Sequence, residues 1–194
     1  TTFLPDGSGV TYTSDIVISG FDPGETLDTM SQLQQICASL EHSYLGDLEI
    51  RIICPTGQDV ILKQYPGGGS CDLGEPIATA PVDGAASSTL TDPGSGYDYC
   101  FNDSPTWGTM VDESNTWTRN YTDAQGNNYT DNYLIAGSYA SFEPLNQLLG
   151  CELNGTWTME VTDNLNLDNG YIFEWNISLT SDLPDTLVVI EQPD

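Results

Sequence analysis

Gly155-Thr156-Trp157-Thr158-Met159-Glu160-Val161-Thr162-Asp163 and, shortly after it, Asp168-Asn169-Gly170-Tyr171-Ile172-Phe173-Glu174-Trp175-Asn176-Ile177 are the stretches that decide the fold of this chain. In the first stretch, Trp157, Met159 and Val161 alternate with polar residues. In the second, every other residue is apolar: Tyr171, Phe173, Trp175, Ile177 and Leu179. A period of two is typical of strands that bury one face. The sequence therefore predicts two half-buried strands.

The segment between these strands is rich in turn-forming residues. From position 163 to position 170 it contains two Asp, three Asn and a terminal Gly. Such residues tolerate positive φ angles and satisfy the polar groups of their own turns. We therefore expect the two strands to form a hairpin with a long loop that carries carboxylates.

The two stretches resemble the end of the proprotein convertase P domain, also called the P/homo B domain. The shared spelling is Gly-Thr-Trp-Thr-x-x-Val-x-Asp followed by Asp-x-Gly-x-Ile-x-x-Trp. Residues 41–57 resemble an earlier part of that family, His-x-x-x-Gly-Asp-Leu, an alternating strand and a Ser-Pro-x-Gly turn, with Cys54 in place of the usual Ser. The resemblance extends over residues 4–179. It implies an all-β jelly-roll sandwich of two antiparallel sheets.

Shorter segments resemble P-like modules in large, multidomain secreted proteins of gliding Bacteroidota. These segments are Gly67-Gly68-Gly69, Leu73-Gly74-Glu75-Pro76, Gly96-Tyr97-Asp98-Tyr99-Cys100 and Leu153-Asn154-Gly155-Thr156. This closer resemblance implies a secreted, extracellular protein at a bacterial cell surface.

The charge of the chain is strongly one-sided. It has 194 residues, with 29 acidic and 3 basic ones, and a formal net charge of −26. Such a surface repels nucleic acid and anionic membranes. The acidity is explained either by solubility in a salty or secreted setting or by carboxylates that hold Ca²⁺, and both explanations can apply together.

Two further features bear on the compartment of the protein. The chain has no apolar run of 18 residues and no basic segment followed by an apolar stretch at its start, so we expect no membrane insertion and place any export signal outside this chain. Five widely spaced cysteines without a Cys-x-x-Cys pair favour disulfides over a zinc site. They are Cys37, Cys54, Cys71, Cys100 and Cys151, an odd number whose pairing the sequence leaves open.

Alternation predicts further strands in the first third of the chain. The first covers residues 15–19, and a second, within residues 31–42, places Ile36, Ala38, Leu40 and His42 on one face. Leu48, Ile50, Ile52 and Cys54 share a face of the next strand, and Val60 and Leu62 continue the pattern after a Pro-Thr-Gly turn. We expect these segments to form a meander.

The middle of the chain and its end follow no sustained period. We expect one domain of residues 1–181, with a loop-rich insertion at residues 65–135. The aromatic residues of the insertion indicate that it is ordered, or that it forms a sugar-binding platform: Trp107, Trp117, Tyr121, Tyr129 and Tyr133. Residues 182–194 are a linker or an extra C-terminal strand. Their β-branched run at 186–190 packs on its own domain, begins the next domain or is covered by another chain.

The chain offers little that is typical of an enzyme. Its single histidine, His42, precedes a Gly-Asp turn and has no Gly-x-Ser-x-Gly elbow or cysteine nucleophile to accompany it. In the P-domain resemblance this histidine is a structural hairpin residue, and the activity associated with the family belongs to a separate protease domain. We therefore expect a chain without catalytic residues.

Five acids lie inside the recognised segments rather than scattered on strand faces, and they are the candidate Ca²⁺ ligands: Asp47, Glu75, Asp98, Asp163 and Asp168. Ca²⁺ takes six to eight oxygen ligands. The loop at 163–168 fails the EF-hand pattern because Leu165 and Leu167 occupy ligand positions, so a site would be assembled from separate loops. The alternative for each acid is turn capping.

The resemblance also implies a role. In the convertases the P domain packs on the catalytic domain and supports its stability and calcium dependence. We therefore expect a non-catalytic, Ca²⁺-stabilised module of a secreted or cell-surface protein. Its partners would be neighbouring domains of the same polypeptide, like chains, or a surface glycan or protein ligand. The alternative is an accessory P domain that stabilises the catalytic domain of an exported protease or other hydrolase.

Overall fold

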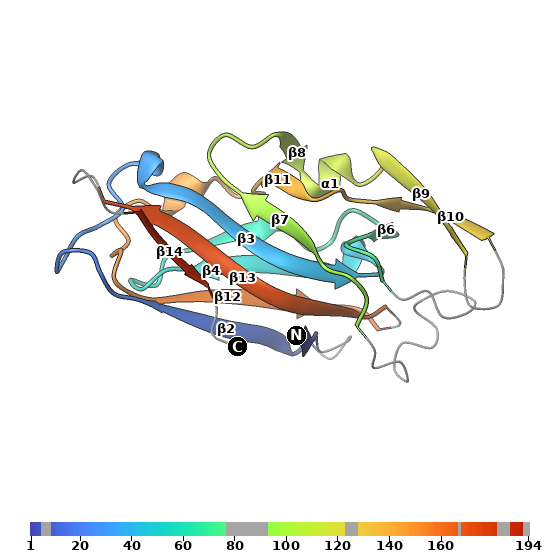
Figure 1. The fold of residues 1–194 in the computed structure, drawn as a ribbon, viewed down its shortest axis with the longest axis horizontal. Coiled ribbons are helices and arrows are strands. Elements are labelled where there is room, and N and C mark those ends of the chain that lie inside the picture. The colour runs from blue at the N-terminus through green and yellow to red at the C-terminus, as the bar shows by residue number, and fades with distance from the viewer. Residues whose placement is uncertain (5–8, 77–92, 123–127, 167, 182–186, 192–194) are drawn as a thin grey trace.

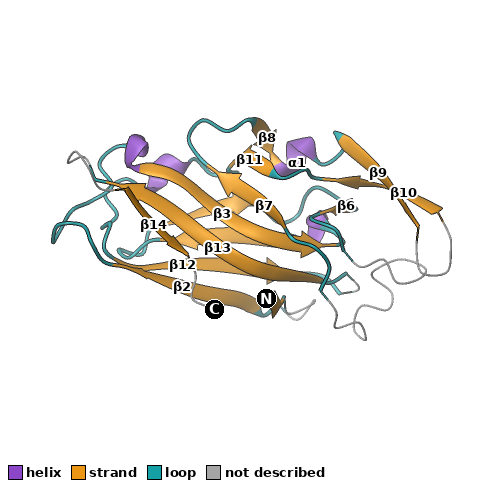
Figure 2. Cartoon of the chain, viewed as in Figure 1, coloured by secondary structure: helices purple, strands orange, loops and turns teal. Residues whose placement is uncertain are grey.

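The structure is a computed structural model that describes the chain except for residues 5–8, 77–92, 123–127, 167, 182–186 and 192–194. Strands make up most of the described molecule, with only short helical turns between them (Figure 2). Two sheets lie face to face and a third, small sheet extends from one end (Figure 1). The expected all-β sandwich is confirmed.

The larger sheet has seven strands, and one of them, β13, pairs with three others. β13 pairs with β3 on one side and with the short β1 and β14 on the other. β11 pairs in parallel with both β7 and β8, whereas the other pairs of this sheet are antiparallel. Its strands, in spatial order with β14 last, are β1 (Thr2–Phe3), β13 (Gly170–Thr180), β3 (Leu33–His42), β7 (Tyr97–Phe101), β11 (Gly137–Ala140), β8 (Trp107–Thr109) and β14 (Leu187–Glu191).

The second layer is an antiparallel sheet of four strands. In order these are β2 (Thr11–Ile18), β12 (Gly155–Asp163), β4 (Leu48–Ile53) and β5 (Asp59–Lys63). The third sheet consists of β6 (Cys71–Asp72), β10 (Asn128–Tyr133) and β9 (Trp117–Thr122). The helical turns are η1 (Met30–Gln32), η2 (Leu45–Asp47), α1 (Met110–Glu113) and η4 (Leu145–Leu148).

The core fills the space between the two large sheets. Trp157 of β12 and Trp175 of β13 are completely buried, and they belong to one continuous apolar cluster. The predicted inner faces are confirmed for β12, for β3 and for β4, because the residues assigned to them are buried. In β3, Cys37 and Glu41 of the other face are buried as well. Burial of apolar side chains on both inner faces is the main force that holds such a sandwich together.

The expected hairpin between residues 155–163 and 170–177 is wrong. β12 pairs with β2 and β4, whereas β13 pairs with β1, β3 and β14, so the two strands lie in opposite sheets. The loop at 164–169 crosses from one sheet to the other. A strand with one buried face shows the same alternation whether its chain neighbour lies beside it or across the core, so the pattern did not distinguish these arrangements.

The expected meander is also wrong in part. β4 and β5 do form an antiparallel hairpin, but β3 belongs to the opposite sheet and pairs with β13 and β7. β7 lies within residues 65–135, so that region contributes a strand to the middle of the larger sheet. At the C-terminal end, β14 pairs with β13 of its own chain over residues 187–191.

A β-bulge changes the expected face of β13. The register with β3 shifts between Ile172 and Glu174, so Ile172 takes the inward position and is 1% exposed. Phe173 lies half-buried instead of in the core, and Tyr171 packs edge-to-face against Phe3, with ring centroids 5.3 Å apart. An extra residue in one strand reverses the direction of the side chains beyond it.

Two disulfides join distant parts of the chain, as the cysteine content predicted. Cys37 pairs with Cys100 across β3 and β7, and Cys54 pairs with Cys151. Cys71 is free and buried, and burial raises the pKa of its thiol to about 12. A thiol in such surroundings stays protonated and unreactive at neutral pH.

Candidate functional site: a buried polar cluster at one end of the sandwich

A buried histidine and a buried aspartate join the two sheets. His42 ends β3 in the larger sheet, Asp163 ends β12 in the smaller one, and both are 0% exposed. His42 Nε2 lies 3.3 Å from Asp163 Oδ2, and His42 Nδ1 accepts the backbone N–H of Tyr44 at 3.0 Å. This arrangement describes the neutral imidazole, with its proton on Nε2 donated to Asp163. Gly170 packs so closely against the His42 ring that a Cβ there would clash.

The crossing loop is tied to the cluster by main-chain hydrogen bonds. Asn164 donates both its backbone N–H and its side-chain Nδ2 to the backbone carbonyl of Asp47, each at 3.0 Å. Leu165 donates its N–H to Asp163 Oδ1 at 3.3 Å. The backbone N–H of Ser43 is bonded to the carbonyl of Asn169 at 3.1 Å. These bonds hold the loop after β12 against the turn that precedes β4.

Asp47 carries a buried oxygen without a hydrogen-bond partner. The residue is 2% exposed, and its Oδ1 atom has no partner in the structure as described. Burial, followed by repulsion from Asp168 and Asp163, raises the pKa of the Asp47 carboxyl to about 6. An unpaired buried carboxylate is costly, so this oxygen favours either a proton or a cation.

Lys63 places a cationic group beside these acids. It is 1% exposed, and its Nζ donates to the carbonyl of Leu48 at 2.7 Å. Burial lowers the pKa of this ammonium group to about 7, against the attraction of Asp47 and Glu49. The sequence pattern missed Lys63, because strict alternation after Leu62 would turn it outward. A register shift between β4 and β5 buries both residues.

The structure brings three of the five candidate ligands together. Asp47, Asp163 and Asp168 are close enough for the two others to repel the Asp47 carboxylate. Glu75 and Asp98 are exposed and lie elsewhere, with Glu75 accepting the Tyr97 hydroxyl at 2.7 Å. Among the residues that the structure describes, no three His, Cys, Asp or Glu side chains are already grouped as metal ligands.

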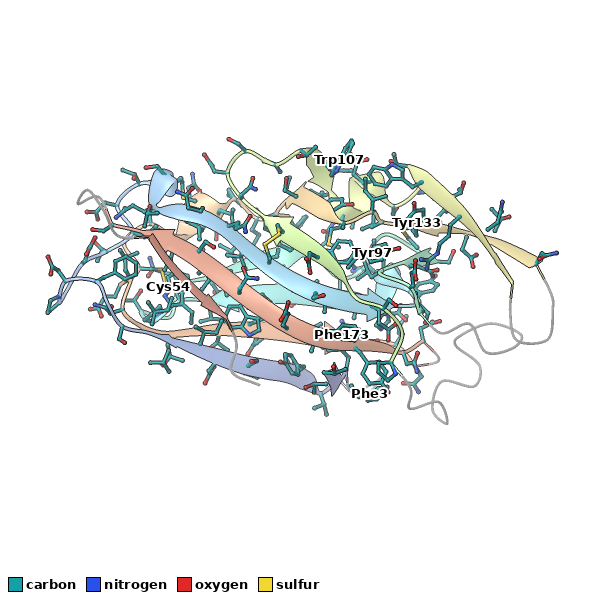
Figure 3. All side chains as sticks on the ribbon, viewed as in Figure 1. Phe3, Cys54, Tyr97, Trp107, Tyr133 and Phe173 are labelled. Carbon is teal, nitrogen blue, oxygen red and sulfur yellow. A yellow bond between two sulfur atoms is a disulfide. The ribbon has the colours of Figure 1, made fainter. Side chains whose placement is uncertain are left out.

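Two aromatics of the predicted platform, Trp107 of β8 and Tyr133 of β10, are labelled in Figure 3. Trp107 and Trp117 meet edge-to-face, with centroids 5.1 Å apart, and both pack against the core. The Arg119 guanidinium lies 5.1 Å from the centre of the Tyr133 ring. The side chains of Tyr121 and Tyr129 lie outside the described part.

His42 is arranged as a structural residue. Both ring nitrogens are engaged, one by Tyr44 and one by Asp163, and the ring is fully buried. A general base needs a nitrogen that can reach a substrate proton. The geometry therefore gives His42 a structural role in joining the sheets. The P-domain resemblance implied a structural residue in a hairpin, but β3 and β4 lie in opposite sheets and form no hairpin.

Replacing Asp47 by Asn is expected to flatten the pH dependence of stability in EDTA. The folded protein holds the Asp47 proton more tightly than the unfolded chain, where the pKa of Asp is about 3.9. The protonated Asp47 carboxyl thus contributes fully to the free energy of unfolding below about pH 4, and this contribution is lost as pH rises through about 6. By neutral pH the free energy of unfolding has fallen by about 3 kcal/mol. Urea unfolding at a series of pH values measures this. Asp98→Asn, which removes an exposed charge, is the control, and parallel curves for Asp47→Asn and the wild type would contradict the expectation.

Comparison with known proteins finds a family model that matches part of this chain. The family model of the proprotein convertase P-domain matches residues 106–179, a segment that includes Asp163 and Asp168 but not Asp47. A solved structure, the crystal structure of Aeromonas sobria serine protease (ASP) and the chaperone (ORF2) complex, is 15% identical over 98% of this chain, with a TM-score of 0.34. The chain spans 21% of the length of that chain.

No curated protein sequence matched the chain. The described residues contain no helix that is both long and apolar enough to cross a membrane. The P domain is a family of non-catalytic accessory domains. Residues 106–179 of this chain are thus similar to the proprotein convertase P-domain.

Proposed function

We propose that the chain is a non-catalytic, Ca²⁺-stabilised module that mediates contacts of a secreted or cell-surface protein with neighbouring domains, like chains or a surface ligand. The P-domain match over residues 106–179 is the observation that carries this proposal. The two disulfides and the family support an extracellular or secreted setting. The resemblance of the shorter segments to modules of gliding Bacteroidota favours a bacterial cell surface.

A second role is favoured by the same family match. The chain would then be an accessory P domain that packs on the catalytic domain of an exported protease or hydrolase and stabilises it. The two roles differ in what flanks the chain in its polypeptide. Similar β modules and a sorting domain support the first role, and a hydrolase domain upstream supports the second. Turnover of a peptide or glycan substrate by the chain alone would contradict both.

The chemistry of the polar cluster suits Ca²⁺. The unpaired Oδ1 of Asp47 and the carboxylates of Asp163 and Asp168 are hard oxygen donors, which Ca²⁺ prefers. A bound cation would neutralise the repulsion among these acids and link the turn before β4 to the loop after β12. Backbone or Asn oxygens of the same loops would supply the remaining ligands.

Addition of millimolar Ca²⁺ is expected to raise the thermal midpoint after EDTA treatment. A ligand at 100 times its Kd stabilises a protein by about 2.7 kcal/mol, which corresponds to about 5–10 °C for a chain of this size. The matched variants are Asp47→Asn and Asp98→Asn, which change the net charge equally. We expect Asp47→Asn to lose most of the rise and Asp98→Asn to keep it.

Magnesium at the same concentration is the control for the ion. Mg²⁺ demands near-octahedral geometry and gives up its water reluctantly, so it should produce a much smaller rise than Ca²⁺. Equal rises with both ions, or equal rises in both variants, would indicate screening of the acidic surface rather than a site. That result would remove Ca²⁺ from the proposal.

A further inference from the structure

β2 is the longest strand at an edge of the two large sheets. It has eight residues, pairs with β12 along its whole length without a register shift, and runs along the lower margin of the molecule (Figure 1). In an antiparallel pair, alternate residues direct their N–H and C=O groups to opposite sides. Half of the main-chain groups of residues 13–18 therefore point away from β12. No described residue is bonded to those groups.

The edge of the smaller sheet opposite β2 and the outer side of β13 are both covered. On the opposite side of the smaller sheet, the edge strand β5 is covered by residues 142 and 143. The backbone N–H groups of Phe142 and Glu143 donate to the carbonyls of Leu62 and Ile61 at 2.9 and 3.0 Å, respectively. The N–H of Ile61 donates to a carboxylate oxygen of Glu143. The outer side of β13 is covered by β1 and β14. In the described part of the chain β2 is thus a long, regular edge strand, and β14 of the larger sheet comes close to it without pairing with it.

β2 also lacks the devices that usually protect an edge. Exposed strands are commonly blunted by lysine, proline or a bulge. β2 contains no lysine or proline and no bulge. Val17 is 68% exposed, the most exposed of the large apolar side chains in the described chain. Asp15 is its one charged residue, and it accepts a hydrogen bond from Thr158 at 2.7 Å.

Charge determines which partner this edge suits. All three basic side chains are engaged within the molecule: Arg51 with Glu49 and Asp59, Arg119 with Asp72, and Lys63 with the Leu48 carbonyl. The surface is left with a large excess of carboxylates, in a chain of net charge −26. A second copy would meet like charge, whereas a cationic chain would meet complementary charge along the same edge.

We propose that the edge of β2 from Thr13 to Ile18 is a docking site for an extended, lysine- or arginine-bearing strand of a partner protein, which adds to the sheet beside β2. This inference rests on the proposed binding role and names its surface and partner chemistry. Main-chain hydrogen bonds would supply the affinity, and the acidic surface would select the basic strand.

The test uses an acetylated octapeptide of alternating lysine and valine, with a peptide of alternating glutamate and valine as its control. Binding is measured by fluorescence anisotropy and located by amide hydrogen exchange. We expect the basic peptide alone to bind and to slow exchange at outward-facing amides of residues 13–18 by about tenfold or more. Val17→Lys, at an exposed position, should weaken binding by about tenfold, whereas Leu149→Lys, which adds the same charge at an exposed position after η4, should change it by less than about twofold.

Three results would overturn the proposal. Equal weakening by the two lysine variants would show non-specific attraction to the acidic surface. Slow exchange of the amides at 13–18 before peptide is added would show that the chain covers this edge itself. Absence of binding would exclude the basic strand as partner. Thermal unfolding with and without Ca²⁺ is measured on the same samples. If the peptide does not bind at β2 but Ca²⁺ still stabilises the protein, this inference is wrong and the proposed calcium-stabilised module is unaffected.

Discussion

Removal of the Cys54–Cys151 disulfide is expected to lower the free energy of unfolding by about 4–5 kcal/mol. The bridge closes a separation of 97 residues, and both of its cysteines are buried. In the chain-entropy model a cross-link of that length strongly restricts the unfolded chain. In the folded protein it joins the residue after β4 to the segment just before β12, at the end of the ladder between these two strands. The variant Cys54→Ala/Cys151→Ala, unfolded in urea, measures the loss.

Two further variants separate the cross-link from the loss of buried side chains. Cys71→Ala removes a buried free thiol without breaking a bridge, and we expect a cost of about 1 kcal/mol. Cys37→Ala/Cys100→Ala opens the other bridge, of separation 63, and should cost nearly as much as the first pair in the same entropic model. If Cys54→Ala/Cys151→Ala lowered the free energy of unfolding no more than Cys71→Ala does, the bridge would not restrict the conformations of the unfolded chain.

Strand positions and core faces could be predicted from this sequence, because a half-buried strand must alternate. Trp157 and Met159 of β12, and Ile36 and Leu40 of β3, are buried as the pattern predicts. Which strands pair could not be predicted in the same way. Alternation records only that one face is buried, and it is the same for a hairpin and for two strands that face each other across a core.

Two β-bulges account for the side chains that the pattern placed wrongly. The bulge in β13 moves Phe173 out of the core, and the shift between β4 and β5 brings Lys63 into it. A bulge inserts one residue into a period of two, so every position beyond it changes face, and the sequence carries no clear sign of where it lies. The buried lysine of the cluster was missed for this reason.

Two of the acids chosen from the recognised segments lie near each other because they adjoin paired strands. Asp47 and Asp163 adjoin strands that pair with each other, β4 and β12, so their turns meet at one end of the sandwich. Glu75 and Asp98 belong to equally recognisable segments, but Asp98 is exposed on β7 in the middle of the larger sheet and Glu75 is exposed in an isolated bridge with Ser95. Recognition of a segment therefore did not indicate which layer its side chains face.

His42→Ala is expected to destabilise the protein by about 3–5 kcal/mol, the usual range when one partner of a buried polar pair is removed and a charge is left behind. Asp163 would remain 0% exposed and would lose its contact with His42 Nε2. The backbone N–H of Tyr44 would lose its acceptor as well. Because His42 and Asp163 end strands of opposite sheets, the loss should open this end of the sandwich. Urea unfolding measures the free energy, and hydrogen exchange locates the opening.

Asp163→Asn is the matched variant for this pair. The amide oxygen can still accept the His42 Nε2 proton, so we expect a cost of about 1–2 kcal/mol, clearly smaller than that of His42→Ala. A double-mutant cycle with both changes should give a coupling of more than about 1 kcal/mol, because the two side chains share one hydrogen bond. Additive effects would show that the two residues act separately. The sheets would then be held together at this end by the apolar core. The Asn164 bonds to Asp47 join two turns of the smaller sheet, and the neighbouring carboxylates would lie in a loop that opens independently of His42.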